Sequence, residues 1–336
     1  MNIQAAPRTL KDYASDQEVR WCPGCGDYAI LKAVQKTLAD LQADPEQTVF
    51  ISGIGCAARF PYYMATYGFH TIHGRAAAVA TGVTLANPDL DVWVISGDGD
   101  SLSIGGNHLL HLLRRDVNLT YLLFNNEVYG LTKGQVSPTS RIGTVTPSSP
   151  RGSSDRPVHA LPFALGAGAR FVARSYDVAQ AHLVETLKRA RAHRGTSFVE
   201  ILQNCIVYND DVFAGITDKS VAADAQLHVV HGQPLRFGKN GEKGIRLDPR
   251  TFRLEAVTVG ENGVSDSDIL VHDETNPALA ALLAALEPPH MPVAFGVIYC
   301  APDEGAARPQ QATVNGSGIA ERLNALMRKG HTWRVQ

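Results

Sequence analysis

The sequence predicts an α/β fold, with a doubly wound, mostly parallel sheet and a C-terminal extension. Short apolar stretches rich in β-branched residues end in Gly, Asp or Asn, as buried strands of a parallel sheet do. Segments with helical periodicity lie between these stretches, and this alternation indicates parallel βαβ units. The composition becomes polar and turn-rich after about residue 208. We therefore expect one domain over residues 1–215 and an extension over residues 216–336 packed on it, with a separate second domain as the alternative.

The overall composition is that of a globular protein with a large core. The chain has 336 residues, of which 44% are hydrophobic and 19% charged. Its net charge is −2 without a basic tract, which does not favour nucleic acid as a partner. No run of eighteen apolar residues occurs, so we expect no membrane span. The polar N-terminal segment lacks the apolar stretch of a signal peptide, and we expect a cytoplasmic protein.

Strands and helices are expected to alternate from the first third of the chain. An apolar face predicts a helix over Tyr28–Leu41, with Asp27 as its N-cap. A β-rich run predicts a strand over Thr48–Ser52. Small residues predict a helix over Ala76–Ala86, which ends at Asn87-Pro88.

The centre of the sequence predicts a strand–helix–strand unit. The two strands are Val92–Ser96 and Leu119–Phe124, and the helix is Gly105–Arg114. Each strand runs into a polar turn, the first containing Asp98 and the second Asn126. Ligands of open α/β sheets bind at the carboxyl edge of the strands, so we expect both side chains at a ligand site.

The rest of the chain is predicted with less detail. The run Tyr129–Ser154 is long, rich in Gly, Ser, Thr and Pro, and aperiodic, which is typical of a functional or mobile loop. Further strands are expected over Ala169–Arg174, Ser197–Leu202 and Val293–Ile298, and further helices over Val178–His193, Pro277–Leu286 and Gly318–Met327.

The two polar turns carry the oxygen ligands that Mg²⁺ prefers. Asp98 supplies a carboxylate, Asn126 an amide oxygen and Val128 a backbone carbonyl, and diphosphate oxygens and water would complete six ligands. Gly97 and Gly99 allow the backbone to approach a phosphate closely. The alternative is two ordinary strand-to-loop turns, in which Gly, Asp and Asn are common.

Four of the five cysteines suggest a metal centre. Cys22 and Cys25 form a C-x-x-C pair, and Cys56 and Cys205 each follow an expected strand. Four thiolates suit a 4Fe–4S cluster. A structural zinc site, a thioredoxin-like dithiol and plain buried cysteines are the alternatives. Cys300 lies in an apolar run and is expected to be a core residue or an inert thiol.

The sequence resembles known thiamine diphosphate and iron–sulfur proteins. Gly97-Asp98-Gly99, followed after about twenty-five residues by Asn125-Asn126, resembles the thiamine diphosphate signature. Together with the cysteines it resembles the 2-oxoacid:ferredoxin oxidoreductases over roughly residues 18–240. The matching segments are Trp21-Cys22-Pro23-Gly24-Cys25-Gly26, Gly53-Ile54-Gly55-Cys56, His73-Gly74-Arg75, Gly97-Asp98-Gly99-Asp100, Ile104-Gly105-Gly106-Asn107-His108, Tyr129-Gly130-Leu131-Thr132-Lys133-Gly134-Gln135 and Ser137-Pro138-Thr139. A departure is Ala57-Ala58, where the family usually has serines.

Within this family the chain looks most like the beta subunit of the 2-oxoglutarate enzymes. The resemblance implies a thiamine diphosphate-binding fold and the oxidative decarboxylation of 2-oxoglutarate to succinyl-CoA and CO₂, or the reverse carboxylation. It implies thiamine diphosphate, Mg²⁺ and one 4Fe–4S cluster that passes electrons to ferredoxin. It also implies an alpha subunit that completes the active site, in an α2β2 heterotetramer, so the single chain is expected to be inactive.

The resemblance assigns roles to individual residues. Asp98, Asn126 and Val128 hold Mg²⁺, and Cys22, Cys25, Cys56 and Cys205 hold the cluster. The residues expected to line the diphosphate and thiazolium are Ile54, Gly55, Ala57, Gly99, Asp100, Gly130 and Leu131. Arg59 is expected to meet the substrate carboxylate, His73 to orient or protonate near the reaction, and Lys133 to contact a phosphate or coenzyme A. A surface arginine, a packed histidine and a solvated loop lysine are the alternatives for these three.

Three other functions stay open from the sequence. One is the oxidation of pyruvate or another 2-oxoacid by the same chemistry. Another is a non-redox thiamine decarboxylase or synthase with a structural metal. The third is a zinc-stabilised binding module without catalytic activity.

Overall fold

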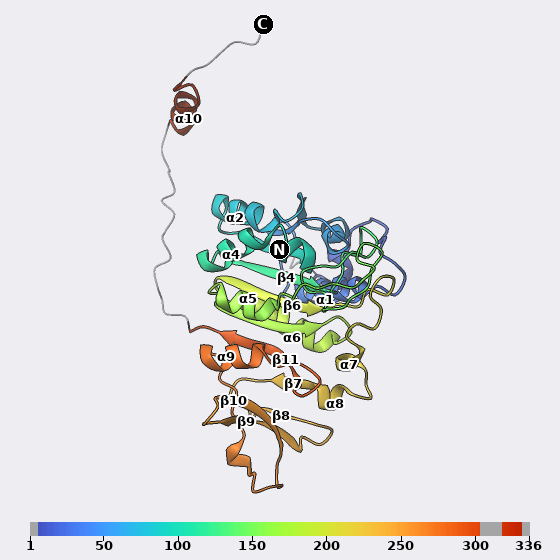
Figure 1. Ribbon diagram of the computed structural model, residues 1–336. Helices are drawn as coiled ribbons and strands as arrows, with labels where there is room; N and C mark the ends of the chain where they lie inside the picture. The colour runs from blue at the N-terminus through green and yellow to red at the C-terminus, as the bar shows by residue number, and fades with distance from the viewer. Residues whose placement is uncertain (1–5, 303–317, 331–336) are drawn as a thin grey trace. The chain divides into compact units, whose positions relative to one another are not determined.

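The structure is a computed structural model that describes residues 6–302 and 318–330. The chain divides into two units, Met1–Pro302 and Asp303–Gln336. In the second unit the described residues form helix α10 (Ile319–Met327), close to the expected helix over Gly318–Met327. The first unit holds all other described elements (Figure 1).

An eight-stranded sheet forms the centre of the first unit, with strand order β2-β1-β3-β4-β6-β5-β11-β7. All neighbouring strands are parallel except β11, which runs antiparallel to β5, so the mostly parallel sheet is confirmed. The strands are β1 (Thr48–Ser52), β2 (Tyr67–His70), β3 (Asp91–Gly97), β4 (Leu119–Asn125), β5 (Phe171–Tyr176), β6 (Thr196–Leu202), β7 (Gln226–Val229) and β11 (Val293–Cys300).

Helices cover both faces of this sheet, which confirms the doubly wound arrangement. Val49 and Ile51 of β1 face a core shared with α2 (Ala76–Ala86) and α4 (Gly106–Arg115), and α5 (Ala160–Gly166) and α9 (Pro277–Ala284) join the same core. Phe50 lies between them in sequence and faces the opposite core, with α1 (Asp27–Asp40) and α6 (Gln180–Ala192). The alternation follows from the two-residue period of a strand, since successive side chains point to opposite faces.

Several elements differ from the sequence-based expectations. The edge strand β2 was not predicted, because all four of its residues are exposed and it lacks the apolar pattern of a buried strand. Asp98 begins the short helix α3 (Asp98–Leu102), where a turn was expected. Asp27 is the first residue of α1 rather than its N-cap, which is Gly26.

The region after residue 215 does not form a simple extension. Strands β7 and β11 come from it and complete the central sheet. A small antiparallel sheet, in the order β10-β9-β8, lies between them in sequence. Its strands are β8 (Arg236–Phe237), β9 (Lys243–Asp248) and β10 (Arg253–Thr258). The parts of the expected extension at 303–317 and 331–336 lie outside the described residues.

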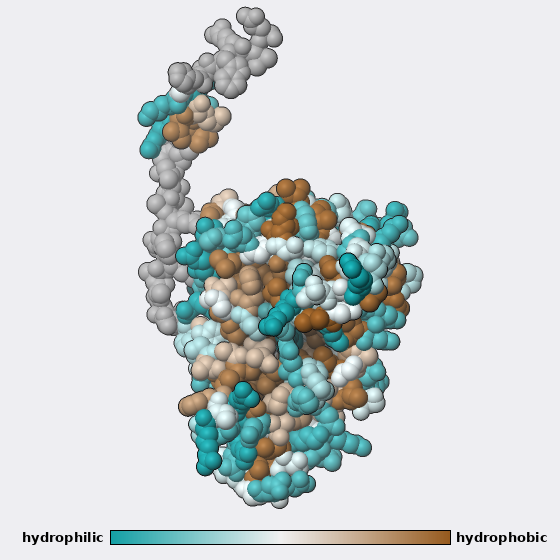
Figure 2. All heavy atoms as spheres, in the orientation of Figure 1, coloured by the Kyte–Doolittle hydropathy of each residue, from teal (hydrophilic) through white to brown (hydrophobic). Residues whose placement is uncertain are grey.

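The remaining elements are short. They are the 3₁₀ helices η1 (Leu10–Tyr13), η2 (Ala57–Tyr63) and η3 (Asp266–Asp268), and the helices α7 (Ala214–Thr217) and α8 (Ala222–Ala225). Over residues 6–302 and 318–330, every helix is too short or too polar to cross a membrane. Figure 2 shows apolar side chains interspersed with polar ones over the visible face.

Candidate active site

A cavity of about 460 Å³ lies where β1, β3 and β4 end. The chain leaves β1 toward β2 on one side, whereas β3 leads to β4 on the other side. Such a reversal of strand order opens a crevice at the carboxyl edge of a sheet, where ligands bind. The volume is that of a site for a cofactor-sized molecule.

The structure brings most of the predicted site residues to this cavity. The seven residues expected to line the cofactor all line this cavity: Ile54, Gly55, Ala57, Gly99, Asp100, Gly130 and Leu131. The three expected Mg²⁺ ligands, His73 and Cys56 line it as well. Arg59 is not among the lining residues, and its Nε donates a hydrogen bond to the Tyr63 hydroxyl at 3.1 Å. Lys133 is an exposed loop residue with a φ of 78°.

Asp98 is a buried carboxylate at the start of α3, only 2% exposed. The hydroxyls of Ser137 and Thr139 each donate to its Oδ2 at 2.5 Å. Burial raises the pKa of Asp98 to about 6, although these hydroxyls act in the opposite direction. A bound cation would favour the charged carboxylate, so this site suits a metal ion.

The turn after β4 presents two more oxygen donors. Glu127 has a φ of 54°, and this left-handed residue turns the chain sharply between Asn126 and Val128. The Asn126 Oδ1 accepts from the Val128 N–H at 3.2 Å, and its Nδ2 donates to Gln203 Oε1 at 2.7 Å. A carboxylate, an amide oxygen and a backbone carbonyl around one cavity are the donor set of a hard divalent cation, so these residues fit Mg²⁺.

Asp100 joins two loops and strand β3 around the cavity. Its Oδ1 accepts from the Gly74 N–H at 2.7 Å and the Ile54 N–H at 3.1 Å, and lies 2.7 Å from His73 Nδ1. Its Oδ2 accepts from the Ser96 hydroxyl at 2.6 Å. With Nδ1 held by the carboxylate, Nε2 is the ring nitrogen that His73 can offer to a ligand.

Glycine is required at one position of this wall. A β-carbon at Gly99 would lie 2.2 Å from the ring of Tyr129, whose hydroxyl donates to the Gly99 carbonyl at 3.0 Å. The Tyr129 ring also packs edge-on against His73, with centroids 6.1 Å apart. Tyr129 therefore shapes the cavity beside His73, and it was not predicted as a site residue.

Four cysteines lie together beside this cavity. A β-carbon at Gly130 would be 3.5 Å from Cys205 Sγ and 3.6 Å from Cys56 Sγ, so the two thiols are neighbours. The charge of Cys56 contributes to raising the pKa of Cys25, and the charge of Cys22 contributes to raising that of Cys56, so these thiols also lie near one another. Burial raises the pKa of Cys56 to about 12 and that of Cys25 further, with Asp27 as the next cause for both.

Aromatic packing holds two of the cysteine loops together. The Trp21 Nε1 donates to the Cys56 carbonyl at 2.7 Å, and the Trp21 ring packs edge-on against Tyr28 and Tyr63. The loop that carries Cys22 and Cys25 is thereby fixed to the loop that carries Cys56. The fifth cysteine, Cys300, lies on β11 with its Sγ 4.0 Å from His193 Nδ1.

The four thiols do not converge on one point. Within the described ranges, no group of three or more His, Cys, Asp or Glu side chains is arranged to hold a single metal ion. Tetrahedral zinc needs all four sulfurs about 2.3 Å from one ion. Four cysteines are also the usual ligand set of a 4Fe–4S cluster, so the residue types present fit such a cluster.

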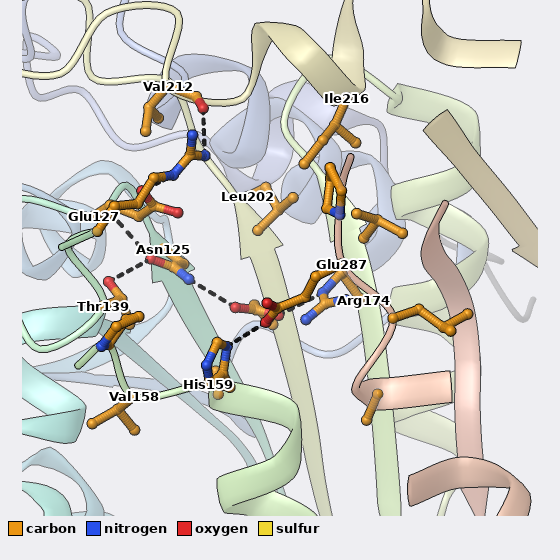
Figure 3. A pocket seen from close by; sticks show the side chains of 18 of the residues that line it. Asn125, Glu127, Thr139, Val158, His159, Arg174, Leu202, Val212, Ile216 and Glu287 are labelled. Carbon is orange, nitrogen blue, oxygen red and sulfur yellow. Dashed lines mark hydrogen bonds and ion pairs between the residues drawn. The ribbon is translucent and has the colours of Figure 1, made fainter. Parts of the chain in front are cut away.

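A second cavity of about 360 Å³ lies behind the turn after β4 (Figure 3). Thr139 connects it to the first, because its hydroxyl is within hydrogen-bond distance of both Asp98 Oδ2 and Asn125 Oδ1, at 2.5 and 3.0 Å. The Asn125 Nδ2 donates to Glu200 Oε1 at 2.8 Å, and Glu200 Oε2 accepts from Arg174 Nε at 2.6 Å. This buried network fixes the groups that support Asp98.

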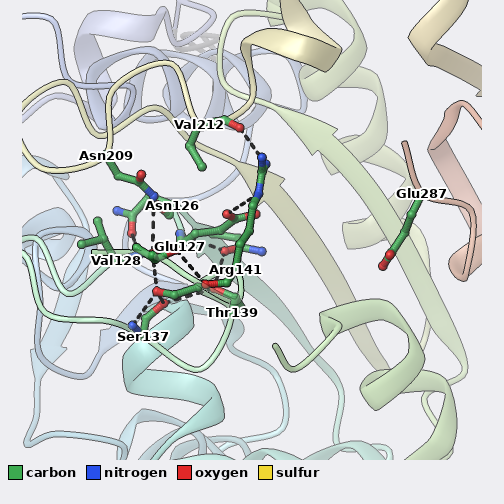
Figure 4. Close-up of polar contacts among 12 residues, drawn as sticks. Asn126, Glu127, Val128, Ser137, Thr139, Arg141, Asn209, Val212 and Glu287 are labelled. Carbon is green, nitrogen blue, oxygen red and sulfur yellow. Dashed lines mark hydrogen bonds and ion pairs between the residues drawn. The ribbon is translucent and has the colours of Figure 1, made fainter. Parts of the chain in front are cut away.

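Loop contacts brace the same turn from outside (Figure 4). The Glu127 carboxylate lies 2.9 Å from Arg141 Nε, and Arg141 Nη2 donates to the Val212 carbonyl at 2.7 Å. Asn209 Nδ2 donates to the Asn126 carbonyl at 2.9 Å. Burial raises the pKa of Glu127 to about 7, against the effect of Arg141. The turn is thus held by the long loop after β4 and by the loop that follows β6.

Sequence reasoning did not assign roles to several of these supporting residues. Ser137 and Thr139 belong to a segment that matches the family, but the match assigns them no role. No motif in the sequence points to Gln203 or Asn209. The available signal was proximity in sequence, since Gln203 and Asn209 flank Cys205. Side chains that act by supporting a ligand carry no spacing rule of their own, so their roles emerge only from the folded structure.

Comparison with protein families identifies one domain in the chain. Residues 53–201 match the C-terminal TPP-binding domain of thiamine pyrophosphate enzymes. This range includes every residue that lines the first cavity, whereas Gln203 and three of the four clustered cysteines, Cys22, Cys25 and Cys205, lie outside it.

Similar proteins of known name extend this match over nearly the whole chain. The 2-oxoglutarate oxidoreductase subunit KorB of Mycobacterium tuberculosis is 48% identical over 98% of this chain and 89% of that protein. The beta subunit of 2-oxoacid:ferredoxin oxidoreductase 1 of Aeropyrum pernix is 48% identical over 61% of this chain and 64% of that protein.

A solved structure has the same fold over the same length. A chain of the 2-oxoglutarate:ferredoxin oxidoreductase from Magnetococcus marinus, solved with 2-oxoglutarate, coenzyme A and succinyl-CoA bound, superposes with a TM-score of 0.73. The two chains are 32% identical, and the match covers 98% of each.

Proposed function

Because this chain belongs to the family of 2-oxoacid:ferredoxin oxidoreductase beta subunits, we propose that its cavity binds thiamine diphosphate for the oxidative decarboxylation of 2-oxoglutarate. The reaction converts one 2-oxoglutarate, one coenzyme A and two oxidised ferredoxins into one succinyl-CoA, one CO₂, two singly reduced ferredoxins and one proton. The bond between the keto and carboxyl carbons breaks, a thioester bond forms, and two electrons leave. The reverse carboxylation follows the same balance.

The cavity wall supplies the binding groups for the cofactor. Asp98, Asn126 and the Val128 carbonyl surround the same cavity, and we propose that they would hold Mg²⁺, whose charge would favour binding of the diphosphate. When bound, thiamine diphosphate supplies the electron sink for decarboxylation. The residues of this chain bind and orient it, and they exclude water from the cavity.

His73 places an imidazole at the cavity. Asp100 holds its Nδ1, and Tyr129 packs against it, so its orientation is defined. We propose that Nε2 of His73 holds or transfers a proton at the reacting carbonyl. Arg59 does not line the cavity, and its side chain bonds to Tyr63. We propose that it attracts the substrate carboxylate from outside the cavity wall.

We propose that Cys22, Cys25, Cys56 and Cys205 hold a 4Fe–4S cluster, because their thiols lie together beside the cavity. Cys56 lines the cofactor cavity and neighbours Cys205, so electrons would cross only a short distance. Ferredoxin is the proposed acceptor, and the reducing cytoplasm is the proposed location, because cluster cysteines must stay reduced.

A partner alpha subunit is proposed to complete the active site, in an α2β2 heterotetramer. The names of the relatives describe subunits, which supports a partner. The edge strand β2 exposes Tyr67 and Phe69, and Ile72 beside His73 is 70% exposed. Apolar groups of this size next to a ligand cavity are typical of a protein interface.

The observation that carries the proposal is the gathering of Asp98, Asn126, Val128 and Cys56 around one cavity. The test is anaerobic co-expression with the alpha subunit, followed by assays of succinyl-CoA formation and ferredoxin reduction. We expect both products with 2-oxoglutarate and neither with the single chain. Turnover of pyruvate alone would assign another 2-oxoacid, and acyl-CoA-free decarboxylation would assign a non-redox thiamine enzyme.

A further inference from the structure

Gln203 lies between the two metal sites described above. It directly follows β6 and is only 1% exposed. Its backbone N–H donates to the Asn125 carbonyl at 2.8 Å, which continues the pairing between β4 and β6. Its side chain therefore starts from a rigid position at the carboxyl edge of the sheet.

Hydrogen bonds define the orientation of the Gln203 amide. The Oδ1 of Asn126 accepts from the Val128 N–H, so Asn126 presents its Nδ2 to Gln203. Gln203 Oε1 accepts a hydrogen bond from Asn126 Nδ2 at 2.7 Å, so Gln203 Nε2 points away from Asn126. Nε2 has two protons, and it donates to Cys25 Sγ at 3.3 Å and to the Asn204 carbonyl at 2.5 Å.

This arrangement uses each end of one amide for a different site. The oxygen end restrains Asn126, whose own amide oxygen is a proposed Mg²⁺ ligand. The nitrogen end donates a proton to the sulfur of Cys25, a proposed cluster ligand. Packing restrains the side chain as well, since a β-carbon at Gly26 would lie 2.9 Å from Gln203 Cγ.

We propose that Gln203 is a positioning residue that couples the cofactor site to the cluster, by holding Asn126 and by donating an N–H···S hydrogen bond to Cys25. The inference rests on the proposed function. When the cluster accepts one electron, it becomes more negative by one charge, and no bond breaks and no proton moves. A hydrogen-bond donor to a ligand sulfur stabilises the reduced form and raises the reduction potential.

Two substitutions separate the two ends of the amide. Gln203→Met removes all three side-chain hydrogen bonds, to Asn126, Cys25 and Asn204, and keeps a side chain of similar length. Gln203→Glu keeps an acceptor for Asn126 but replaces the donor to Cys25 by a carboxylate. Gln35→Met is the matched control, because Gln35 is buried at 6% exposure and, among the described residues, its side chain hydrogen-bonds to the Tyr63 carbonyl, at 3.3 Å, and to no cysteine.

The readouts are the cluster reduction potential, from an anaerobic titration followed by EPR, and the Kd of thiamine diphosphate with Mg²⁺. Both use the complex with the alpha subunit. We expect both Gln203 variants to disfavour cluster reduction on the order of tenfold, which is about 59 mV for one electron. Gln203→Met should also weaken cofactor binding severalfold, whereas Gln203→Glu should keep an affinity near that of the wild type.

The outcomes distinguish this inference from the proposed function. If the wild-type complex contains no iron, the proposed cluster fails and the Gln203 role fails with it. If iron is present and both Gln203 variants keep the potential of Gln35→Met, the proposed function stands and the positioning role is overturned. A lower potential in both variants, with weaker cofactor binding only in Gln203→Met, supports the coupling.

Discussion

His73 Nδ1 lies 2.7 Å from Asp100 Oδ1, and this contact joins the loop after β2 to helix α3. The carboxylate also accepts the backbone N–H groups of Ile54 and Gly74, so one buried group fixes a histidine and two loops. A ring held at Nδ1 has a defined tautomer and orientation, which is the arrangement that proton transfer at the other nitrogen requires.

Asp100→Asn should lower the turnover of the complex by about 10- to 100-fold, the usual cost of losing a carboxylate that orients a histidine. The amide keeps the size of the side chain, but it has one accepting end, so it cannot serve both His73 and Gly74 at the Oδ1 position and Ser96 at the Oδ2 position, and it carries no charge to hold the ring. The measurement is steady-state ferredoxin reduction with saturating 2-oxoglutarate. Asp91→Asn, at the opposite end of β3, is the control, and equal activity of the two variants would contradict the role of Asp100.

Asp98→Asn should abolish the stabilisation of the protein by Mg²⁺ and thiamine diphosphate together. Binding to the folded state raises the melting temperature, and removal of the charged metal ligand removes this linkage. The measurement is the melting temperature of the complex with both ligands, with the cofactor alone, and after EDTA. The exposed Asp89→Asn is the control, and an unchanged ligand-dependent shift in Asp98→Asn would remove Asp98 from the Mg²⁺ ligands.

Thr139→Val should weaken Mg²⁺-dependent cofactor binding about tenfold, because support of a metal ligand typically contributes this much to affinity. The change keeps the shape of the side chain but removes the hydroxyl between Asp98 and Asn125. The free energy of unfolding should also fall by about 1–3 kcal/mol, since buried partners lose a hydrogen bond.

The control for Thr139 is Thr37→Val, another buried threonine, whose hydroxyl donates to the Ala33 carbonyl within α1, at 2.8 Å, and to no other group in the described part of the chain. The Kd of the cofactor for each variant is measured by calorimetry on the complex. An equal loss of affinity in both variants would show a general effect of the substitution rather than support of Asp98.

Cys56→Ser should remove the iron–sulfur cluster and ferredoxin reduction from the complex. A serine oxygen is a poorer ligand for iron than a thiolate. Of the four clustered cysteines, Cys56 is the one that lines the cofactor cavity. Iron and sulfide content and the EPR spectrum are the readouts. Cys300→Ser is the matched control and should keep a full cluster; loss of iron in that variant as well would contradict the assignment.

The backbone framework could be predicted from periodicity, whereas the supports of the site could not. The strand β1 and the helix α2 were predicted with the bounds they have, because each buries a regular apolar pattern. The exposed edge strand β2 has no such pattern, and β7 and β11 join the central sheet from a region whose composition suggested an extension. Pairing partners distant in sequence leave little local signal.

The candidate site divides in the same way. Asp98, Asn126 and the cysteines follow from chemistry at strand ends, and the structure brings Asp98, Asn126 and Cys56 to one cavity. Thr139 and Gln203 act through these residues across loops, so they need the fold to be recognised. The buried Asp27 shows the same limit, because an N-cap was expected and neither of its carboxylate oxygens has a hydrogen-bond partner among the described residues.

His182 should make the protein less stable as the pH falls below 6.5. Burial, with a smaller effect of His228, lowers the pKa of His182 to about 4. The ring lies 2.9 Å from the Ser175 hydroxyl through Nδ1 and packs edge-on against His228, with centroids 5.1 Å apart. The unfolded chain therefore binds the proton more tightly than the folded protein does. The contribution of neutral His182 to the free energy of unfolding is fully present above pH 6.5 and is lost between pH 6.5 and about 4. The loss is on the order of 3 kcal/mol at most.

His182→Gln should remove this part of the pH dependence, because glutamine stays neutral and can still bond to Ser175. The melting temperature of the complex is measured from pH 7.5 to 4.5 for the wild type, for His182→Gln and for the exposed control His290→Gln. The wild type and the control should lose stability faster than His182→Gln as the pH falls. Parallel curves for all three proteins would mean that protonation of His182 does not limit the stability of the fold.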